Sequence, residues 1–181
     1  NRLNGDIVDR VYFGQGKPAT GPISHLLAWA YTPDVRQYPH DVRAAKALLD
    51  EAGVKAGADG IRFRITFTHS TNHQRLAQVL REQLKAVGIG LELQTMDFNG
   101  QVEQVFVKKT FDLGIASYCN GADPDIGVRR VYVSSNIGPY PFSNGAGYRN
   151  PRIDTLFEEA GALVDFQSRR DPYDQIPRLI G

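Results

Sequence analysis

Residues 61–68 read Ile61-Arg62-Phe63-Arg64-Ile65-Thr66-Phe67-Thr68, and every second side chain is apolar. That alternation predicts a strand with one buried face. A helical pattern follows between Ser70 or Thr71 and Gly88, with apolar side chains three or four positions apart at Leu76, Val79, Leu80, Leu84 and Val87. Alternation resumes at Ile89, Leu91 and Leu93. Strand, helix and strand make a βαβ unit, so we expect an α/β fold with these two strands parallel.

A third strand, with turn chemistry at its carboxyl end, is predicted at residues 111–116. The apolar side chains of Phe111, Leu113 and Ile115 alternate there with smaller or polar ones. The residues that then stop the strand and expose polar groups are Asn120, Gly121, Asp123 and Pro124. Because ligands of open α/β sheets usually lie at the carboxyl ends of the strands, this strand end is the candidate site.

Further helices are predicted before and after these strands. Each has a recognisable start: one follows Asp6, one follows an N-cap at Asp41 and ends at Gly53, and one begins at Asn150-Pro151. One face of the helix after Asp41 is expected to carry Val42, Ala45, Leu48, Leu49 and Ala52. The last segment begins helically after Asp171-Pro172 but meets Pro177, which should distort the helix.

Two long loops carry aromatic side chains. Residues 17–39 contain several prolines and glycines, which exclude a long regular element, but the apolar residues around Trp29 predict that the loop packs on the body of the protein. Trp29 is interpreted as an anchor of that packing, with stacking against a ligand as the alternative. Residues 134–148 are rich in Gly, Ser, Asn and Pro and include Tyr140, Phe142 and Tyr148.

The composition gives no support for several kinds of partner. The 181 residues include 21 Lys and Arg and 20 Asp and Glu, a net charge of +1, so no basic excess points to nucleic acid or an anionic membrane surface. The basic pairs Lys108-Lys109, Arg129-Arg130 and Arg169-Arg170 are expected to be solvated surface. Cys119 is the single cysteine, which fits the cytoplasm and the periplasm equally. No apolar run approaches the roughly 20 residues that span a bilayer.

The sequence offers little support for catalysis. It contains no nucleophile elbow, no P-loop and no dinucleotide fingerprint after a strand. Cys119, or Asp123 and Asp125 as an acid/base pair, leaves open a self-contained α/β enzyme, although these two aspartates more simply form an Asx-type turn. His69 and His73 stand four residues apart, a spacing that two metal ligands can share, but no third ligand is near. We therefore expect no catalytic residue, no metal and no cofactor.

Six short motifs occur in an order that resembles the peptide/nickel class, family 5, of extracytoplasmic solute-binding proteins of ABC transporters. Together they cover nearly the whole chain, and the third is the most specific. The motifs are Asp9-Arg10-Val11-Tyr12-x-Gly14; Pro18-Ala19-x-Gly21-Pro22-Ile23; Ala44-Ala45-Lys46-Ala47-Leu48-Leu49-Asp50-Glu51-Ala52-Gly53; Leu80-x-x-Gln83-Leu84-Lys85-x-x-Gly88-Ile89; Phe111-Asp112-Leu113 with Asp123-Pro124-Asp125; and Asn150-Pro151-x-Ile153-Asp154-x-Leu156.

The resemblance implies a type II periplasmic-binding-protein fold, in which two α/β lobes close over a small solute. Residues 1–181 resemble the carboxyl-terminal lobe, a mixed sheet flanked by helices, with the amino-terminal lobe and the final return segment absent. Since closure needs both lobes, the 181-residue chain alone is expected to bind weakly or not at all. The resemblance further implies a periplasmic or membrane-associated extracytoplasmic protein that is not an enzyme. It would deliver a peptide, or else a sugar, an opine or a nickel chelate, to an ABC permease, with no nucleic-acid partner.

The resemblance also suggests which residues bind the solute. In peptide-binding members, an aspartate just before the Asp-Pro pair often neutralises the α-ammonium group of the peptide. Alignment on Asp123-Pro124 places Asn120 at that position, and asparagine can hydrogen-bond an ammonium without supplying a charge. A shift of one or two residues would instead give Asp123 the role. Tyr118 matches an aromatic residue common at the start of this turn, and the long loop adds Tyr140, Phe142 and Asn144 as candidates.

Overall fold

The computed structural model describes residues 2–180, with side chains from Ile7 to Ile180, and it divides into two compact units. The first unit contains the residues up to Pro18, Pro39–Val105 and Thr110–Ala116. The second contains Ala19–Tyr38, Phe106–Lys109 and the residues from Ser117 onward. Each unit has a hydrophobic core of its own. The assignment of residues 1–181 to a single lobe stays a prediction.

A three-stranded parallel sheet lies at the centre of the first unit. Its strands are β1 (Phe63–Ser70), β2 (Ile89–Met96) and β3 (Leu113–Gly114), in the order β2-β1-β3. Phe67 of β1 is in register with Leu93 of β2 and with Leu113 of β3. The α/β class and the parallel βαβ unit are confirmed. The prediction of a mixed sheet is wrong, because every pairing between the described strands is parallel.

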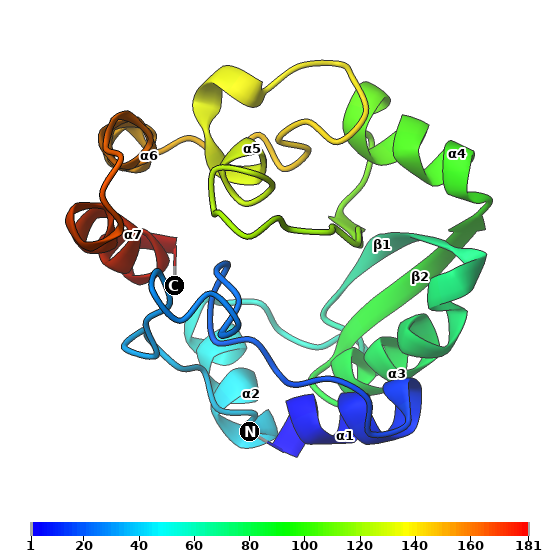
Figure 1. Cartoon of the computed structure of the whole chain (residues 1–181). Coiled ribbons are helices and arrows are strands. Elements are labelled where there is room, and N and C mark those ends of the chain that lie inside the picture. Colours follow the sequence, from blue (N-terminus) through cyan, green and yellow to red (C-terminus); the bar gives the residue numbers. More distant parts are fainter. Residues whose placement is uncertain (1, 181) are drawn as a thin grey trace. The chain divides into compact units, whose positions relative to one another are not determined.

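Helix α3 (Gln74–Lys85) packs on this sheet and completes the core of the first unit. It follows one turn of 3-10 helix, η1 (Thr71–His73), and lies against β1 and β2 (Figure 1). The apolar side of α3 meets the inward side chains of the strands, with Phe67, Ala77 and Leu91 buried at the centre. Gly88 has a φ of 87°, a conformation that glycine adopts without strain, and it joins α3 to β2.

The third strand is shorter than predicted, because side chains replace its ladder hydrogen bonds. The Asp112 carboxylate accepts a hydrogen bond from the backbone N–H of Thr66 in β1 at 2.8 Å. The Gln101 side-chain amide donates to the backbone carbonyl of Ile115. These two contacts flank Leu113–Gly114, the only residues of the predicted 111–116 strand that pair as a strand.

The first unit also contains α1 (Arg2–Tyr12), α2 (Val42–Glu51), α4 (Phe98–Val102) and the start of a π-helical segment, η2 (Glu103–Lys108). Asp41 caps α2 as predicted, since its carboxylate accepts hydrogen bonds from the N–H groups of Arg43 and Ala44. No residue of α2 is buried, and Leu48 on its apolar face is 66% exposed. Amphipathic spacing thus located this helix correctly but did not show what covers it.

The second unit is mainly helical. It contains α5 (Arg129–Tyr132), η3 (Ser134–Asn136), α6 (Pro151–Ala162) and α7 (Phe166–Ile180), and α6 and α7 lie side by side (Figure 1). Asn150 caps α6, because its side-chain oxygen accepts the N–H of Arg152 at 3.1 Å. The core is built around α6 and α7 from Ile23, Ala30, Val128, Val133, Ile153, Leu156, Phe157, Ala160, Tyr173 and Ile176.

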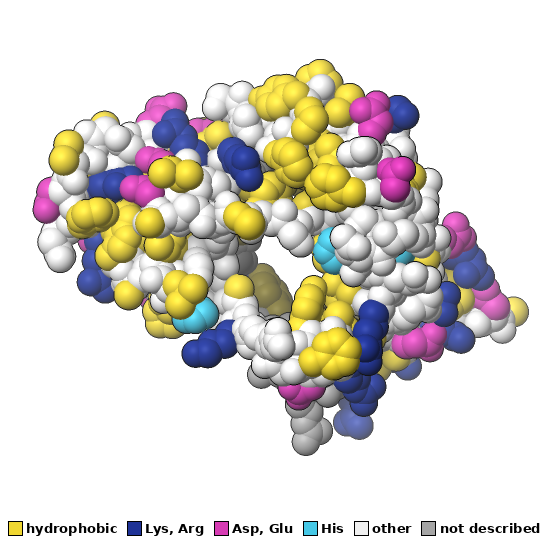
Figure 2. Space-filling model, turned by 45° about the vertical axis from the view of Figure 1, so that its right-hand side comes forward, with side chains coloured by type: hydrophobic (Ala, Val, Ile, Leu, Met, Phe, Trp, Pro, Cys, Tyr) yellow, Lys and Arg dark blue, Asp and Glu magenta, His cyan; other side chains and the backbone are white. Residues whose placement is uncertain are grey.

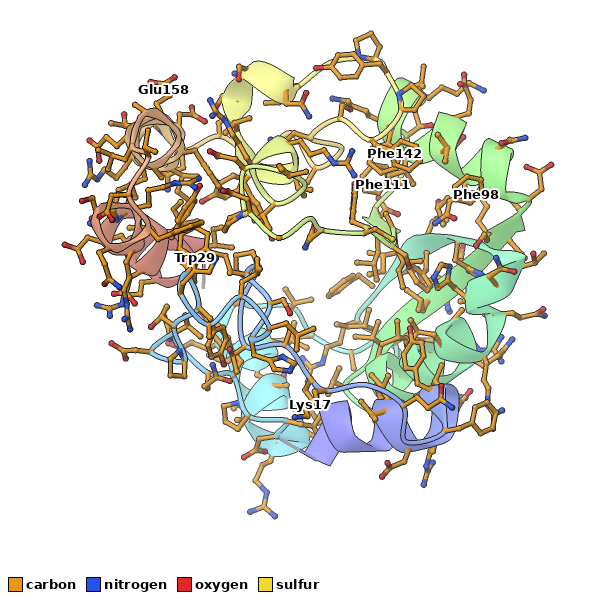
Figure 3. All side chains as sticks on the ribbon, viewed as in Figure 1. Lys17, Trp29, Phe98, Phe111, Phe142 and Glu158 are labelled. Carbon is orange, nitrogen blue, oxygen red and sulfur yellow. The ribbon has the colours of Figure 1, made fainter. Side chains whose placement is uncertain are left out.

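Helix α7 begins earlier than predicted and runs through both of its prolines. Asp165 stabilises its first turn by accepting the backbone N–H and the hydroxyl of Ser168, each at 2.8 Å. Pro172 and Pro177 remove two backbone donors, but both are buried among core residues of the helix, and that packing offsets the lost hydrogen bonds. The anchor role predicted for Trp29, which is labelled in Figure 3, is confirmed. Its ring lies edge-on to the rings of Phe166 and Tyr173 in α7.

Candidate functional site

The turn at residues 120–127 closes on itself through backbone hydrogen bonds. Gly121 N–H donates to the Ile126 carbonyl and Ile126 N–H donates to the Asp123 carbonyl, both at 2.9 Å. The Asp123 carboxylate accepts the N–H of Asp125 at 3.0 Å, which is the Asx-type turn that the sequence predicts. The turn is therefore a fixed frame in the second unit, and the side chains on it have defined positions.

The Asp123 carboxylate is held by a buried cation from α7. Arg169 makes a two-pronged contact with it, Nη1 to Oδ2 at 2.6 Å and Nη2 to Oδ1 at 2.9 Å. The same guanidinium donates from Nε to the Ala160 carbonyl at 2.9 Å and from Nη2 to the Tyr173 hydroxyl at 2.8 Å. Arg169 is only 8% exposed, so the prediction that it lies on a solvated surface is wrong. Its ion pair with Asp123 satisfies the charge that burial would otherwise disfavour.

This ion pair sets the protonation of the groups around it. Burial alone would raise the pKa of the Asp123 carboxyl, but the hydrogen bonds from Arg169 and from the Asp125 N–H outweigh it, and the pKa is lowered. The hydrogen bond to Asp123 raises the pKa of Arg169 further above its ordinary value. Burial, together with the nearby aspartates, raises the pKa of the Tyr173 hydroxyl. At neutral pH the cluster is thus a charged pair beside a neutral phenol.

Asp125, the second candidate for acid/base chemistry, is also paired. Its Oδ2 lies 3.4 Å from Arg169 Nη2 and its Oδ1 lies 3.7 Å from Arg129 Nη1. Both aspartates of the Asp-Pro-Asp motif therefore face arginines of their own unit. Cys119 is exposed. The proposed solute contact of Asp123 stays a prediction, and its present bonds give it a role in joining the turn to α7.

Tyr118 belongs to an aromatic cluster, which we define as Phe106, Tyr118 and Phe142 with Arg130 stacked on it. Ring centroids within the cluster are 5.5 to 6.4 Å apart. The Arg130 guanidinium carbon lies 5.2 Å from the ring centre of Tyr118 and 5.9 Å from that of Phe142. Burial raises the pKa of the Tyr118 hydroxyl, and the Arg130 charge acts in the opposite direction. Figure 2 shows hydrophobic side chains gathered at the top of the view, over the segment with α5 and the loop after it.

Asn120 is the first residue of the turn at residues 120–127. It is exposed, and its side chain makes no hydrogen bond to any residue between Ile7 and Ile180. The amide is seated against Gly127, whose φ is 129° and where an added Cβ would lie 2.6 Å from Asn120 Oδ1. Gly127 is therefore required twice, for its backbone conformation and for the space that Asn120 occupies.

The loop after η3 places Tyr140, Phe142 and Asn144 in three different environments. Tyr140 is exposed and donates its hydroxyl proton to Asn136 Oδ1 at 3.0 Å. Phe142, labelled in Figure 3, has a left-handed backbone with a φ of 59°, a conformation that costs an aromatic residue about 1 kcal/mol or more. Asn144 is fully buried, and its amide bonds the backbone of Val133 and Tyr148. Asn144 thus shapes the loop, and its solute contact stays a prediction.

The two histidines of the first unit hydrogen-bond within that unit. The fully buried His69 has Nδ1 at 2.9 Å from the Ser70 carbonyl, so Nδ1 carries the proton, and Nε2 at 3.2 Å accepts from the Thr95 hydroxyl. Nδ1 of His73 lies 3.0 Å from the Ser70 hydroxyl, and burial lowers the His73 pKa. Within the described part of the chain, no group of three or more His, Cys, Asp or Glu side chains could hold a metal ion.

Two residues of the cluster were missed by sequence reasoning. Phe106 lies in the π-helical segment, and Arg130 was assigned to solvated surface as one of a basic pair. The signal for Arg130 was weak, because only the fold brings it over Tyr118 and Phe142. Tyr118 and Phe142 were both predicted, and the structure brings them together with ring centroids 6.3 Å apart.

The fold is similar to that of solved solute-binding proteins. A profile of the bacterial extracellular solute-binding proteins, family 5 middle region, matches residues 5–139, more than half of the chain. The chain belongs to this family. The resemblance predicted from the sequence and the extracytoplasmic localisation that it implied are confirmed by this family match.

Individual relatives agree with the family assignment. The chain is 31% identical to the oligopeptide-binding protein AppA of Bacillus subtilis, over 96% of this chain and 34% of AppA. It is 29% identical to the glutathione-binding protein GsiB of Shigella flexneri, over 85% of this chain and 30% of GsiB. The solved structure of Bacillus subtilis AppA in complex with a nonapeptide superposes with a TM-score of 0.84 at 28% identity, over 98% of this chain and 37% of AppA. The chain therefore spans about a third of the length of these relatives.

None of the helices in the described range is both long enough and apolar enough to cross a membrane.

Proposed function

We propose that the protein containing this chain is the substrate-binding component of an ABC importer. It captures a peptide or a similar small solute in an interlobe cleft and delivers it to a permease in the membrane, without changing the solute chemically. Family membership supports the proposal, as do relatives named for binding oligopeptides and glutathione. Because the chain spans about a third of those relatives, the proposal concerns the whole receptor.

The observation that carries the proposal is the exposed amide of Asn120, which has no hydrogen-bond partner among the described residues and lies two positions after the stacked ring of Tyr118. Solute-binding sites combine apolar and aromatic walls with a few polar groups that fix orientation. Here Tyr118 and Phe142 supply the aromatic surface, and Asn120 supplies an NH2 group that donates and a carbonyl oxygen that accepts hydrogen bonds. The aspartates that could act as an acid/base pair are instead bound to arginines, which favours binding over catalysis.

The candidate residues have two kinds of role in this proposal. Tyr118, Asn120 and Phe142 contact the solute, and the exposed Tyr140 can join them from the same loop. Asp123 and Asn144 fix the turn and the loop from which the other side chains project. This division follows their bonding: the amide of Asn144 and the carboxylate of Asp123 are already hydrogen-bonded within the unit.

The experiment is a thermal-unfolding screen of the whole receptor with synthetic peptides of roughly two to five residues. Bound peptides should raise the unfolding temperature, because a ligand that binds only the folded state stabilises it. Asn120→Ala should weaken binding roughly fivefold, the effect of one lost hydrogen bond of about 1 kcal/mol. Asn99→Ala, an exposed asparagine on α4, is the matched control and should bind as the wild type does.

Two results would contradict the proposal. One is the absence of any stabilising peptide. The other is cleavage of the peptides during incubation, detected by mass spectrometry and abolished by alkylation of Cys119 or by Asp125→Asn. That second result would establish the enzyme alternative.

A further inference from the structure

The charges around the turn are unevenly paired. Both carboxylates of the Asp-Pro-Asp motif are neutralised inside the unit: Asp123 by Arg169 at 2.6 and 2.9 Å, and Asp125 by Arg169 at 3.4 Å and Arg129 at 3.7 Å. The turn therefore offers a solute no free negative charge, although it is the most acidic stretch near the candidate site.

Two cations of the second unit pair with no carboxylate of the described residues. The guanidinium of Arg130 is exposed and makes no hydrogen bond or ion pair with any other residue that the structure describes. It stacks on the rings of Tyr118 and Phe142. The ammonium of Lys109 donates to the backbone carbonyl of Asn144 at 3.4 Å and pairs with no carboxylate in the described range. Both cations thus lie around the loop that holds Phe142.

Stacking gives Arg130 a property that a solvated arginine lacks. A guanidinium held over aromatic rings keeps its plane fixed while its N–H edges remain free. Those edges match the two oxygens of a carboxylate in a bidentate contact, and less side-chain entropy is lost when the cation is already oriented. The aromatic cluster, whose Tyr118 precedes Asn120 by two residues, therefore presents an oriented cation.

We propose that Arg130, oriented by Tyr118 and Phe142, binds a carboxylate of the solute, so that the receptor selects acidic solutes. This inference rests on the proposed function and names the chemical class of its solute. The uncharged Asn120 is consistent with this proposal. If the part of the solute that contacts this unit carries a carboxylate and no ammonium group, the protein needs no aspartate at position 120. Lys109 adds positive potential to the same loop.

The test measures binding of charge-matched peptide pairs to the whole receptor by calorimetry. Each pair is a tripeptide with Glu at one position and the same tripeptide with Gln. C-terminal amides of every peptide distinguish a side-chain carboxylate from the terminal one. We expect the wild type to bind a carboxylate form roughly 10-fold more tightly than its neutral partner, the effect of one charged hydrogen-bonded contact.

Three variants separate the role of Arg130 from a general charge effect. Arg130→Gln should abolish the preference for the acid, and Arg130→Lys should keep part of it, because lysine retains the charge but not the fork. Arg152→Gln removes an exposed arginine of α6 that pairs with Glu159, and it should keep the full preference. Urea unfolding of each variant, followed by circular dichroism, checks that the fold is retained.

The outcomes separate this inference from the proposed function. Equal binding of acidic and neutral peptides by the wild type, or an unchanged preference in Arg130→Gln, would overturn the inference and leave the proposed function standing. Failure of every peptide to bind, acidic or neutral, would overturn both.

Discussion

Replacing Arg169 by Met tests whether the ion pair with Asp123 joins the candidate turn to α7. The substitution removes both prongs of that pair and the bonds to the Ala160 carbonyl and the Tyr173 hydroxyl. Side-chain exposure is 10% for Arg169 and 24% for Asp123, so the aspartate is left charged and largely buried.

The expected destabilisation follows from that burial. Removing one partner of a buried pair costs about 3–5 kcal/mol. Asp123 keeps some solvent access and its bond from the Asp125 N–H, so we expect a loss in the free energy of unfolding somewhat below that range, about 2–3 kcal/mol. The double variant Asp123→Asn/Arg169→Met should lose less free energy of unfolding than the two single variants lose in sum. The difference, the coupling energy, should be about 1–3 kcal/mol.

The assay is urea unfolding followed by circular dichroism and by the fluorescence of Trp29, the only tryptophan, which lies against α7. With a denaturant slope of about 2 kcal/mol per molar urea, the midpoint should fall by roughly 1–1.5 M. Arg178→Met is the control, because Arg178 is 47% exposed and pairs with Asp174 on the surface, where a loss below about 1 kcal/mol is expected. The reasoning fails if Arg169→Met is no more destabilising than Arg178→Met.

Three further predictions use the same unfolding measurement. The pKa of Asp123 is lowered in the folded state, so the stability that its carboxylate contributes is complete above its unfolded pKa of about 3.9 and is lost as the pH falls below that value. The difference in the free energy of unfolding between wild type and Asp123→Asn should therefore narrow in acid. A difference that stays constant with pH contradicts this. Asn150→Ala should cost about 1 kcal/mol by removing the cap of α6, and an unchanged midpoint would argue against the cap. Gly127→Ala should cost about 1–3 kcal/mol through backbone strain and displace Asn120, so it should weaken solute binding as well.

Local patterns in the sequence predicted the parts of the fold that depend on local physics. The alternation at 61–68 and 89–93 and the helical spacing between them yielded the βαβ unit, and Asp41 and Asn150 marked two helix starts correctly. These features arise within a few residues of each other, where propensity and side-chain period act directly.

Contacts between distant residues could not be predicted. The shortening of β3 depends on Asp112 reaching Thr66, 46 residues away, and the burial of Arg169 depends on Asp123, also 46 residues away. A helix through Pro172 and Pro177 contradicts local propensity and forms because the core covers it. The candidate site shows the same division: Tyr118, Asn120 and Phe142 were found from turn chemistry and resemblance, but Arg130 became visible only when the fold stacked it on two of them.

Mass spectrometry of the whole receptor, purified gently and kept under native conditions, tests the central claim most directly. A receptor that captures a solute should carry one small molecule per protein, released intact by denaturation, and our inference about Arg130 predicts that this molecule has a carboxylate. A peptide is expected, although the identity of the released molecule would decide among peptide, sugar, opine and nickel chelate. A receptor that carries no solute and gains none from peptide mixtures, or that releases only cleaved products, would contradict the account.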